Sequence, residues 1–200
     1  MPGNTRPREK ELWERALHRP AEEAVPADCP GRWWVAHTKP RSEKALALDL
    51  ERRRIPYYLP LRRRTTHSRA TGRASHSIVP VFTGYVFFNA VEQQRIQALT
   101  TNRIVSTLEV VDQQRLVFEL RQIQRVICTD SEFEWGERLE VGDWVRVIAG
   151  PLMGVEGVVR GRRSRARLVL NVQMLAQSVQ LEVERSLLER IDPPSFHSAR

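Results

Sequence analysis

The segment Val141-Gly-Asp-Trp-Val-Arg-Val-Ile-Ala-Gly-Pro-Leu-Met-Gly-Val-Glu-Gly-Val-Val-Arg160 decides the fold of the C-terminal part of this chain. Side chains alternate over Trp144–Ile148 with the period of a strand that buries one face. Gly150-Pro151 begins a reversal, because proline presets its own φ. Gly154 is predicted to adopt a positive φ, and Gly157 to lie where another backbone approaches closely. The segment therefore predicts two short strands joined by a glycine-proline turn.

More short alternating segments follow this hairpin, at 166–173, 179–183 and 187–191. Five short strands within residues 139–192 are typical of a small all-β, SH3-like barrel. The glycine spacing of residues 141–160 resembles the KOW motif, which ribosomal proteins also carry.

The part of the chain before this barrel mixes helix and strand patterns. We expect strands at 33–38, 57–61 and 104–110, a strand, bend and strand over 78–89, a polar loop at 62–77, and helices at 42–54, 92–100 and 112–127. This order predicts an α+β protein whose first domain is an α/β sandwich, an antiparallel sheet with flanking helices. The expected division is a poorly ordered extension (1–30), the sandwich domain (31–128), a linker (129–138), the barrel domain (139–192) and a tail (193–200).

Composition limits the class of protein. The chain has 200 residues and a formal net charge of +8, which suggests a polyanionic partner. No apolar run approaches the roughly 18 residues of a membrane span, and the N-terminus lacks the apolar core of a signal peptide. Cys29 and Cys128 have no metal-ligand spacing and are expected to be free thiols. These features predict a cytoplasmic protein with no membrane partner.

Three stretches of the first domain resemble the NGN domain of the NusG family of transcription elongation factors. They are Trp33-Trp34-Val35 followed by Lys39-Pro40-Arg41-Ser42-Glu43, then Tyr57-Tyr58-Leu59-Pro60, and Phe82-Thr83-Gly84-Tyr85-Val86-Phe87-Phe88. The last stretch is similar to the family's Phe-Pro-Gly-Tyr-Val signature, with Thr83 in place of the usual proline. Together with the KOW pattern, the resemblance spans about residues 32–192.

The resemblance implies a binding surface for RNA polymerase. In the family, a hydrophobic pocket of the NGN domain receives the clamp helices of the largest polymerase subunit, and such docking needs exposed apolar side chains on a rigid sheet. The corresponding positions are Tyr58, Pro60, Phe82, Tyr85 and Phe87. Alternation places Tyr85 and Phe87 on the opposite face from Val86 and Phe88, so one pair belongs to the core. We expect the Tyr85 face to be the docking face.

A run free of acidic residues extends from Arg52 to Val91. The arginines at the end of the predicted helix 42–54 complement the helix dipole. No such reason applies to the arginines in or beside the polar loop, which are Arg62, Arg63, Arg64, Arg69 and Arg73. They suit phosphate contacts. The resemblance implies that non-template or upstream DNA lies near, although solvated loop charge would also explain them.

A second acid-free run, from Gly157 to Leu181, carries an arginine cluster in the barrel domain. Its members are Arg160, Arg162, Arg163, Arg165 and Arg167. KOW domains of the family bind the termination factor Rho or a small-subunit ribosomal protein, whereas related barrels in ribosomes bind RNA. The cluster suits RNA or an acidic protein surface equally.

No catalytic arrangement is found among the five histidines, and no nucleotide-binding motif is present. We expect no enzyme activity, no cofactor and no metal, and a monomer. The predicted function is an elongation factor that suppresses pausing and termination. Met174-Leu175-Ala176-Gln177 replaces the Phe-Gly-Arg turn of general NusG, which favours a specialised, RfaH-like antiterminator. The alternatives are a general NusG that couples polymerase to Rho or the ribosome, and an RNA-binding protein of ribosomal type.

Overall fold

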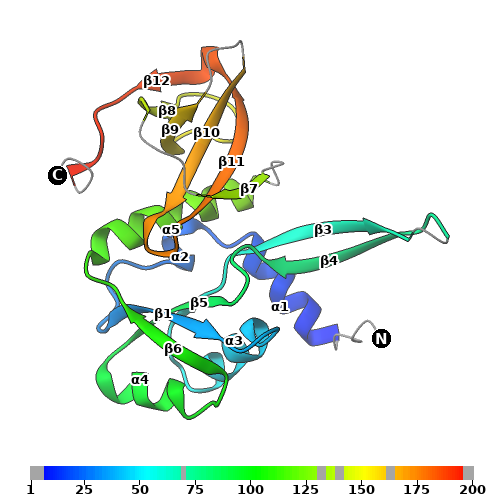
Figure 1. Ribbon diagram of the computed structural model, residues 1–200, viewed down its shortest axis with the longest axis vertical. Coiled ribbons are helices and arrows are strands. Elements are labelled where there is room, and N and C mark those ends of the chain that lie inside the picture. Colours follow the sequence, from blue (N-terminus) through cyan, green and yellow to red (C-terminus); the bar gives the residue numbers. More distant parts are fainter. Residues whose placement is uncertain (1–6, 69–70, 130–133, 138–141, 161–164, 196–200) are drawn as a thin grey trace. The chain divides into compact units, whose positions relative to one another are not determined.

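The computed structural model describes residues 7–68, 71–129, 134–137, 142–160 and 165–195. The chain forms two compact units (Figure 1). The first unit consists of Met1–Arg19 and Asp28–Val111, and the second of Pro20–Ala27 and Asp112–Arg200. The first unit contains a β-sheet together with helices, and the second unit contains an antiparallel β-sheet. The predicted α+β class is therefore confirmed.

The first unit is built on a four-stranded antiparallel sheet with the order β2-β5-β1-β6. Its strands are β1 (Arg32–Thr38), β2 (Tyr57–Tyr58), β5 (Tyr85–Ala90) and β6 (Ile104–Glu109). Because β1 and β5 are the central strands, most of their side chains are buried. Val35, Phe87 and Phe88 are all 0% exposed, which explains the nearly continuous apolar sequence of both strands.

Two helices connect the strands of this sheet. Helix α3 (Glu43–Arg52) contacts β2 and β5 and contributes Leu46, Ala47 and Leu50 to the core. Helix α4 (Glu92–Leu99) places the guanidinium of Arg95 5.1 Å from the ring centroid of Trp34 on β1. Both helices lie where the sequence predicted them.

The N-terminal segment differs from the poorly ordered extension expected for residues 1–30. Residues Pro7–Leu17 form helix α1, in which Trp13 and Leu17 are each 2% exposed. The Lys44 Nζ atom lies 5.4 Å from the centroid of the Trp13 ring. A short helix α2 (Ala21–Ala24) follows and belongs to the second unit. The two apolar side chains are four positions apart and share one helix face, so their burial orders the segment.

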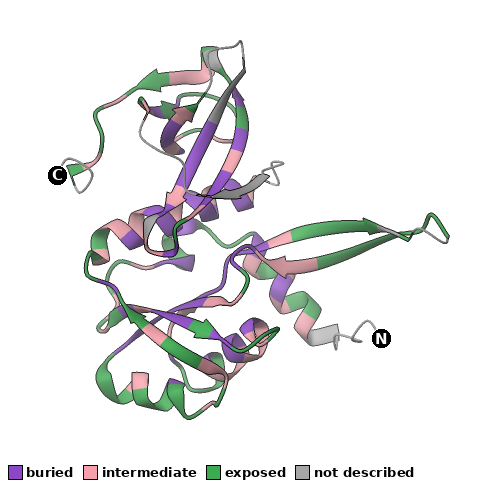
Figure 2. Cartoon of the chain, in the orientation of Figure 1, coloured by how far each residue is buried: buried purple, intermediate pink, exposed green. Residues whose placement is uncertain are grey.

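Residues 62–77 are also not the polar loop that the sequence suggested. They form most of a two-stranded antiparallel ribbon of β3 (Leu61–His67) and β4 (Ala74–Pro80). Figure 2 shows that the ribbon is exposed along most of its length, with buried residues only at its base. Gly72 adopts a φ of +67° in the connection. A strand that is polar on both faces has no hydrophobic alternation to reveal it.

The second unit contains a six-stranded antiparallel sheet with the order β12-β8-β9-β10-β11-β7. Its strands are β7 (Glu134–Glu137), β8 (Trp144–Val147), β9 (Glu156–Arg160), β10 (Arg165–Val172), β11 (Gln177–Glu184) and β12 (Leu188–Arg190). Strand β7 lies in the predicted linker 129–138 and pairs with β11, a difference from the expected coil. Four residues are too few for a strand period to be recognised.

Helix α5 (Gln113–Cys128), predicted in the first domain, belongs to the second compact unit. Its N-cap residue is Asp112, whose carboxylate accepts a hydrogen bond from the Arg115 amide at 2.9 Å. The helix contacts β10, and the Gln122 side-chain oxygen accepts a hydrogen bond from the Glu156 amide at 2.9 Å. Helix α5 is thus part of the packing of the β-sheet unit.

The glycine positions of the β8–β9 hairpin agree with the sequence prediction. Gly150 and Gly154 have φ values of +84° and +83°. At Gly157, an added Cβ would lie 2.8 Å from the Val169 carbonyl oxygen and 2.8 Å from a Leu170 methyl carbon. The predicted close approach of another backbone is therefore present, and glycine allows β9 and β10 to pair at this point.

Candidate functional surfaces

The five residues predicted to dock RNA polymerase differ sharply in accessibility. Tyr58, Phe82 and Phe87 are 4%, 0% and 0% exposed, and Pro60 is buried as well. Only Tyr85 is half-buried and reaches the surface. The Phe87 ring lies 6.0 Å from that of Phe82, nearly perpendicular, and 6.2 Å from that of Tyr58. Tyr58, Phe82 and Phe87 therefore form a buried aromatic layer, and neither they nor Pro60 offer a surface that a partner can touch.

Strand register identifies the neighbours of Tyr85. Tyr85 on β5 pairs with His37 on β1, and His37 pairs with Ser106 on β6, so these three side chains form a row across one sheet face. The Tyr85 and His37 ring centroids are 5.3 Å apart with a tilt of 30°. His37 and Ser106 are exposed, and Leu108 in the adjacent row is 38% exposed. We call Tyr85, His37 and Ser106 the Tyr85 row.

Most of the Tyr85 row is not evident from the amino-acid sequence. His37 lies at the end of the predicted strand 33–38, and no pattern in the sequence singles out Ser106 or Leu108. A signal for His37 was present, because it alternates with Trp33 and Val35 and thus shares their sheet face. The register that brings β6 beside β1 joins positions far apart in the chain and could not be read from periodicity.

The turn before β5 is fixed by a buried carboxylate. Glu43, at the start of α3 and 5% exposed, accepts a hydrogen bond from the Gly84 amide at 2.7 Å. The Gly84 carbonyl accepts one from the Thr38 amide at 2.8 Å. Gly84 has a φ of +84°, a conformation that favours glycine, whereas Thr83 is exposed. These contacts hold the backbone that presents Tyr85.

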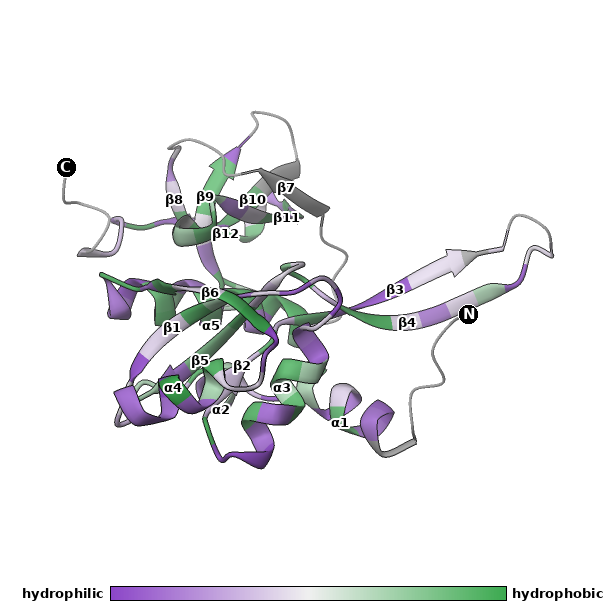
Figure 3. Ribbon diagram, turned by 60° about the horizontal axis from the view of Figure 1, so that its bottom comes forward, coloured by the Kyte–Doolittle hydropathy of each residue, from purple (hydrophilic) through white to green (hydrophobic). Residues whose placement is uncertain are grey.

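The predicted DNA-binding arginines mostly lie on the β3–β4 ribbon. Arg63, Arg64 and Arg73 are exposed and Arg62 is half-buried, while Arg69 lies outside the described residues. Figure 3 shows the hydrophilic stretch near the base of β3. The ribbon thus brings Arg62, Arg63 and Arg64 together in one strand, and alternation sends Arg63 to the opposite face from the other two.

The predicted partner site of the barrel domain can be followed only in part. Arg162 and Arg163 lie outside the described residues, and Arg160 is exposed at the end of β9. In backbone register, Arg167 pairs with Arg160 and with Glu182, and Arg165 with Glu184. Two glutamates of β11, Glu182 and Glu184, therefore stand opposite Arg167 and Arg165 in the backbone register. The acid-free run in the sequence does not reveal this pairing.

An apolar surface lies at the turn of the β8–β9 hairpin. Ile148 is 48% exposed and Met153 is 70% exposed, while Val155 between the same strands is buried. Large apolar side chains at the tip of a turn are available to a protein partner. The sequence pattern of this segment predicts the hairpin but not the exposure of these two side chains.

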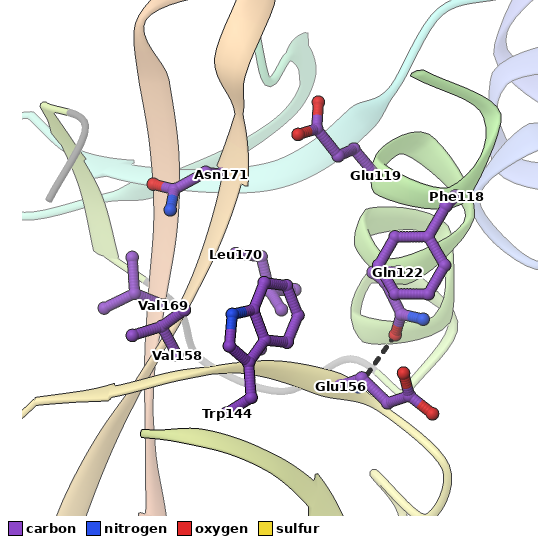
Figure 4. A pocket seen from close by; sticks show the side chains of 10 residues that line it. Phe118, Glu119, Gln122, Trp144, Glu156, Val158, Val169, Leu170 and Asn171 are labelled. Carbon is purple, nitrogen blue, oxygen red and sulfur yellow. Dashed lines mark hydrogen bonds between the residues drawn. The ribbon is translucent and has the colours of Figure 1, made fainter. Parts of the chain in front are cut away.

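A small cavity lies between α5 and the sheet of the second unit (Figure 4). Its polar lining includes Glu119, Gln122 and Asn171, and its volume of about 20 Å³ suits roughly one water molecule. Ligand pockets are typically some 300–1,000 Å³. This cavity is therefore a packing feature of the unit.

Within the described ranges, no three histidine, cysteine, aspartate or glutamate side chains are grouped so that they could hold a metal ion. No helix in the described part of the chain is long and apolar enough to cross a membrane. Cys29 and Cys128 are both half-buried and are not joined in a disulfide.

Comparison with known proteins gives a family match for the first domain. Residues 31–127 match the family described as transcription termination factor nusG. This family consists of transcription factors, in agreement with the prediction that the chain is not an enzyme. No curated protein matches the chain.

Two solved structures are similar to parts of the chain. One, described as "Domain interaction in Thermotoga maritima NusG", has 17% sequence identity and a TM-score of 0.43, and the alignment covers 80% of this chain and 97% of that one. The other, described as "Crystal Structure of MjSpt4:Spt5 complex conformation B", has 15% identity and a TM-score of 0.28, with the same coverage of 80% and 97%.

Proposed function

We propose, from the match of residues 31–127 to the NusG family of transcription factors, that the chain is an elongation factor that binds RNA polymerase and suppresses pausing and termination. The polymerase clamp helices would dock on the Tyr85 row. The β3–β4 ribbon would contact non-template or upstream DNA, and the barrel domain would recruit a second partner. It would act in the cytoplasm as a monomer.

The accessibility of Tyr85 is the observation that carries this proposal. Tyr85 is the one residue of the predicted docking set that is not buried, and its ring is held against His37 by a turn that Glu43 fixes. A rigid aromatic side chain contributes contact area at a low cost in conformational entropy. Leu108 adds apolar surface in the next row. This arrangement suits a helix that lays its apolar face on the sheet.

The proposed effect on transcription follows from differential binding. A factor that bridges the clamp binds the closed polymerase more tightly than the opened, paused states, and it shifts the population toward the closed form. Arginines on the ribbon would add contacts to DNA phosphates, which position the factor without reading sequence. Antitermination would result from the same shift, because a terminating complex passes through a paused state.

The barrel domain is proposed to bind a protein, such as Rho or a small-subunit ribosomal protein. The exposed Ile148 and Met153 support a protein partner, since RNA recognition relies on charge and on stacking with bases. The arginine cluster from Arg160 to Arg167 would contribute charge at this interface. Met153→Ser should then weaken binding of the protein partner without changing RNA binding.

A binding experiment tests the docking surface. Core RNA polymerase would be titrated with the full chain and with Tyr85→Ala and Ile96→Ala. Ile96 is a matched control, because it is 51% exposed on α4, and α4 places Arg95 over Trp34, whose side chain alternates with His37 and lies on the opposite sheet face. Loss of a central aromatic anchor typically costs about 2 kcal/mol or more, roughly 30-fold in Kd.

Tyr85→Ala should lose binding while Ile96→Ala retains it. Equal binding by the wild type and both variants would reject the Tyr85 row as the docking surface. Retention of the chain on ribosomal RNA, with no binding to polymerase, would instead favour the RNA-binding alternative.

A further inference from the structure

The β3–β4 ribbon has two chemically different faces. Cross-strand pairing places Arg62 opposite Val79 and Arg64 opposite Ser77 on one face. The same register places Arg63 opposite Ile78 and Thr65 opposite His76 on the other. We name them the Arg64 face and the Arg63 face. The sequence contains three consecutive arginines, but the strand period assigns them to different surroundings.

The Arg64 face is open. Arg64 is exposed, and its guanidinium has no hydrogen-bond or ion-pair partner in the portion of the chain that the structure describes. Two hydroxyl groups on exposed residues share this face, Thr66 and its cross-strand partner Ser75. An exposed guanidinium beside hydroxyl donors is the set of groups that most often contacts the phosphates of DNA.

The Arg63 face is occupied by the N-terminal helix. The Arg63 guanidinium donates to the Glu14 carboxylate at 2.9 Å, and the same nitrogen lies 3.2 Å from Nε2 of His18. Thr65 and His76 on this face are joined to each other at 3.0 Å. The charge of Arg63 is thus already matched by a carboxylate of the same chain.

Helix α1 holds Glu14 in place. Trp13 and Leu17, on either side of Glu14 in the sequence, are each 2% exposed, and Lys44 lies over the Trp13 ring. The α1 helix contacts β3 within the first unit, and Figure 1 shows it beneath the base of the ribbon. Because the backbone of Glu14 is fixed by two buried neighbours, the Arg63–Glu14 pair does not depend on a loose terminus.

We propose that α1 makes the ribbon one-sided: Arg64, with Arg62, binds the phosphate backbone of DNA, while Glu14 keeps Arg63 out of the contact. This inference rests on the proposed DNA contact of the ribbon and adds which face makes it and what limits it. Glu14 acts as an internal competitor for a phosphate. Its removal frees a further arginine and strengthens DNA binding.

The salt dependence of DNA binding reports how many arginines contact phosphates. Each phosphate that a protein neutralises changes the slope of log K against log salt by about 0.9 on duplex DNA and about 0.7 on a single strand. The probe is a short fluorescein-labelled DNA duplex of mixed sequence, with the single strand as a second arm. Anisotropy titrations of the full chain run from about 50 to 200 mM salt. The variants are Arg64→Gln, Arg63→Gln, Glu14→Gln and Glu14→Gln/Arg63→Gln.

A matched control is Glu11→Gln, which removes the same charge from an exposed position of α1 that has no partner among the described residues. It separates the Arg63 pair from a general change in net charge.

The expected pattern has opposite signs at Glu14 and Arg64. Glu14→Gln steepens the slope by about 1 and tightens binding several-fold, up to about eightfold at 0.1 M salt, as one more released counterion requires. Arg64→Gln makes the slope shallower by about 1. Arg63→Gln and the double variant bind like the wild type, and Glu11→Gln changes the slope far less than Glu14→Gln.

Two results overturn the inference and leave the proposed DNA contact intact. One is a Glu14→Gln slope equal to that of Glu11→Gln while Arg64→Gln still weakens binding. The other is a loss with Arg63→Gln as large as that with Arg64→Gln. If the wild type does not bind DNA, or Arg64→Gln binds as tightly as the wild type, the DNA contact itself is rejected and the inference with it.

Discussion

The buried carboxylate of Glu43 offers the sharpest test of how the fold presents the Tyr85 row. Its side chain is 5% exposed and accepts a hydrogen bond from the Gly84 amide at 2.7 Å. A hydrogen bond to a charged group contributes about 1.5–3 kcal/mol net. A carboxylate in the first turn of α3 adds about 0.3–1 kcal/mol from the helix dipole. In Glu43→Ala both contributions are lost and the Gly84 amide is left without its acceptor.

The expected result is local. Hydrogen exchange of the Gly84 amide, followed by NMR in the folded protein, should accelerate by roughly 10- to 100-fold in Glu43→Ala, since each 1.4 kcal/mol is a factor of ten. Glu43→Gln is the control, because its amide oxygen still accepts the hydrogen bond and neutral hydrogen bonds are about half as strong as charged ones. It should show an intermediate rate.

Binding to core polymerase should follow the same order, since the turn positions Tyr85. Unchanged exchange at Gly84 in Glu43→Ala would refute the role of Glu43 as the anchor. Faster exchange with wild-type polymerase affinity would show that the turn is anchored as described but that the docking surface does not depend on it.

Three other substitutions have expected outcomes. Gly157→Ala should lower the free energy of unfolding of the second unit by about 1–3 kcal/mol, because the new Cβ would lie 2.8 Å from the Val169 carbonyl oxygen. Urea denaturation measures this change, and an unchanged midpoint would contradict the close approach of β9 and β10. Trp13→Ala should lower the free energy of unfolding of the first unit by about 3–5 kcal/mol in urea denaturation, since Trp13 is 2% exposed. Wild-type stability of this variant would show that α1 does not pack on the first unit through Trp13. Tyr85→Phe should bind polymerase with a Kd within a few-fold of wild type, because the ring is retained. The titration described for Tyr85→Ala measures this Kd. A loss of affinity as large as with alanine would mean that the hydroxyl, not the ring, makes the contact.

Much of the fold was predictable from local signals. Alternation and glycine spacing identified β8 and β9, including the positive φ of Gly154, because these signals lie within a few residues of each other. The apolar run at β5 and the apolar period of α5 were recognised for the same reason. The β3–β4 ribbon was missed, since its strands are polar on both faces and leave no period to detect.

The candidate surfaces were less predictable because they depend on contacts between distant positions. Alternation showed that Tyr85 and Phe87 share a face, but it could not show that Phe87 is 0% exposed and Tyr85 accessible. The same holds for Arg63, whose partner Glu14 is 49 positions away. Burial and pairing of this kind are set by tertiary structure, and no local pattern in the sequence reports them.

The central claim is that the chain shortens transcriptional pauses by docking on polymerase through Tyr85. The most direct measurement is the lifetime of a defined pause on a single template, with core polymerase alone, with the full chain, and with Tyr85→Ala, each at a concentration that saturates wild-type binding. The account predicts shorter pauses with the wild type and the lifetime of polymerase alone with Tyr85→Ala. Pauses that the wild type lengthens or leaves unchanged, or that Tyr85→Ala shortens equally, would contradict it.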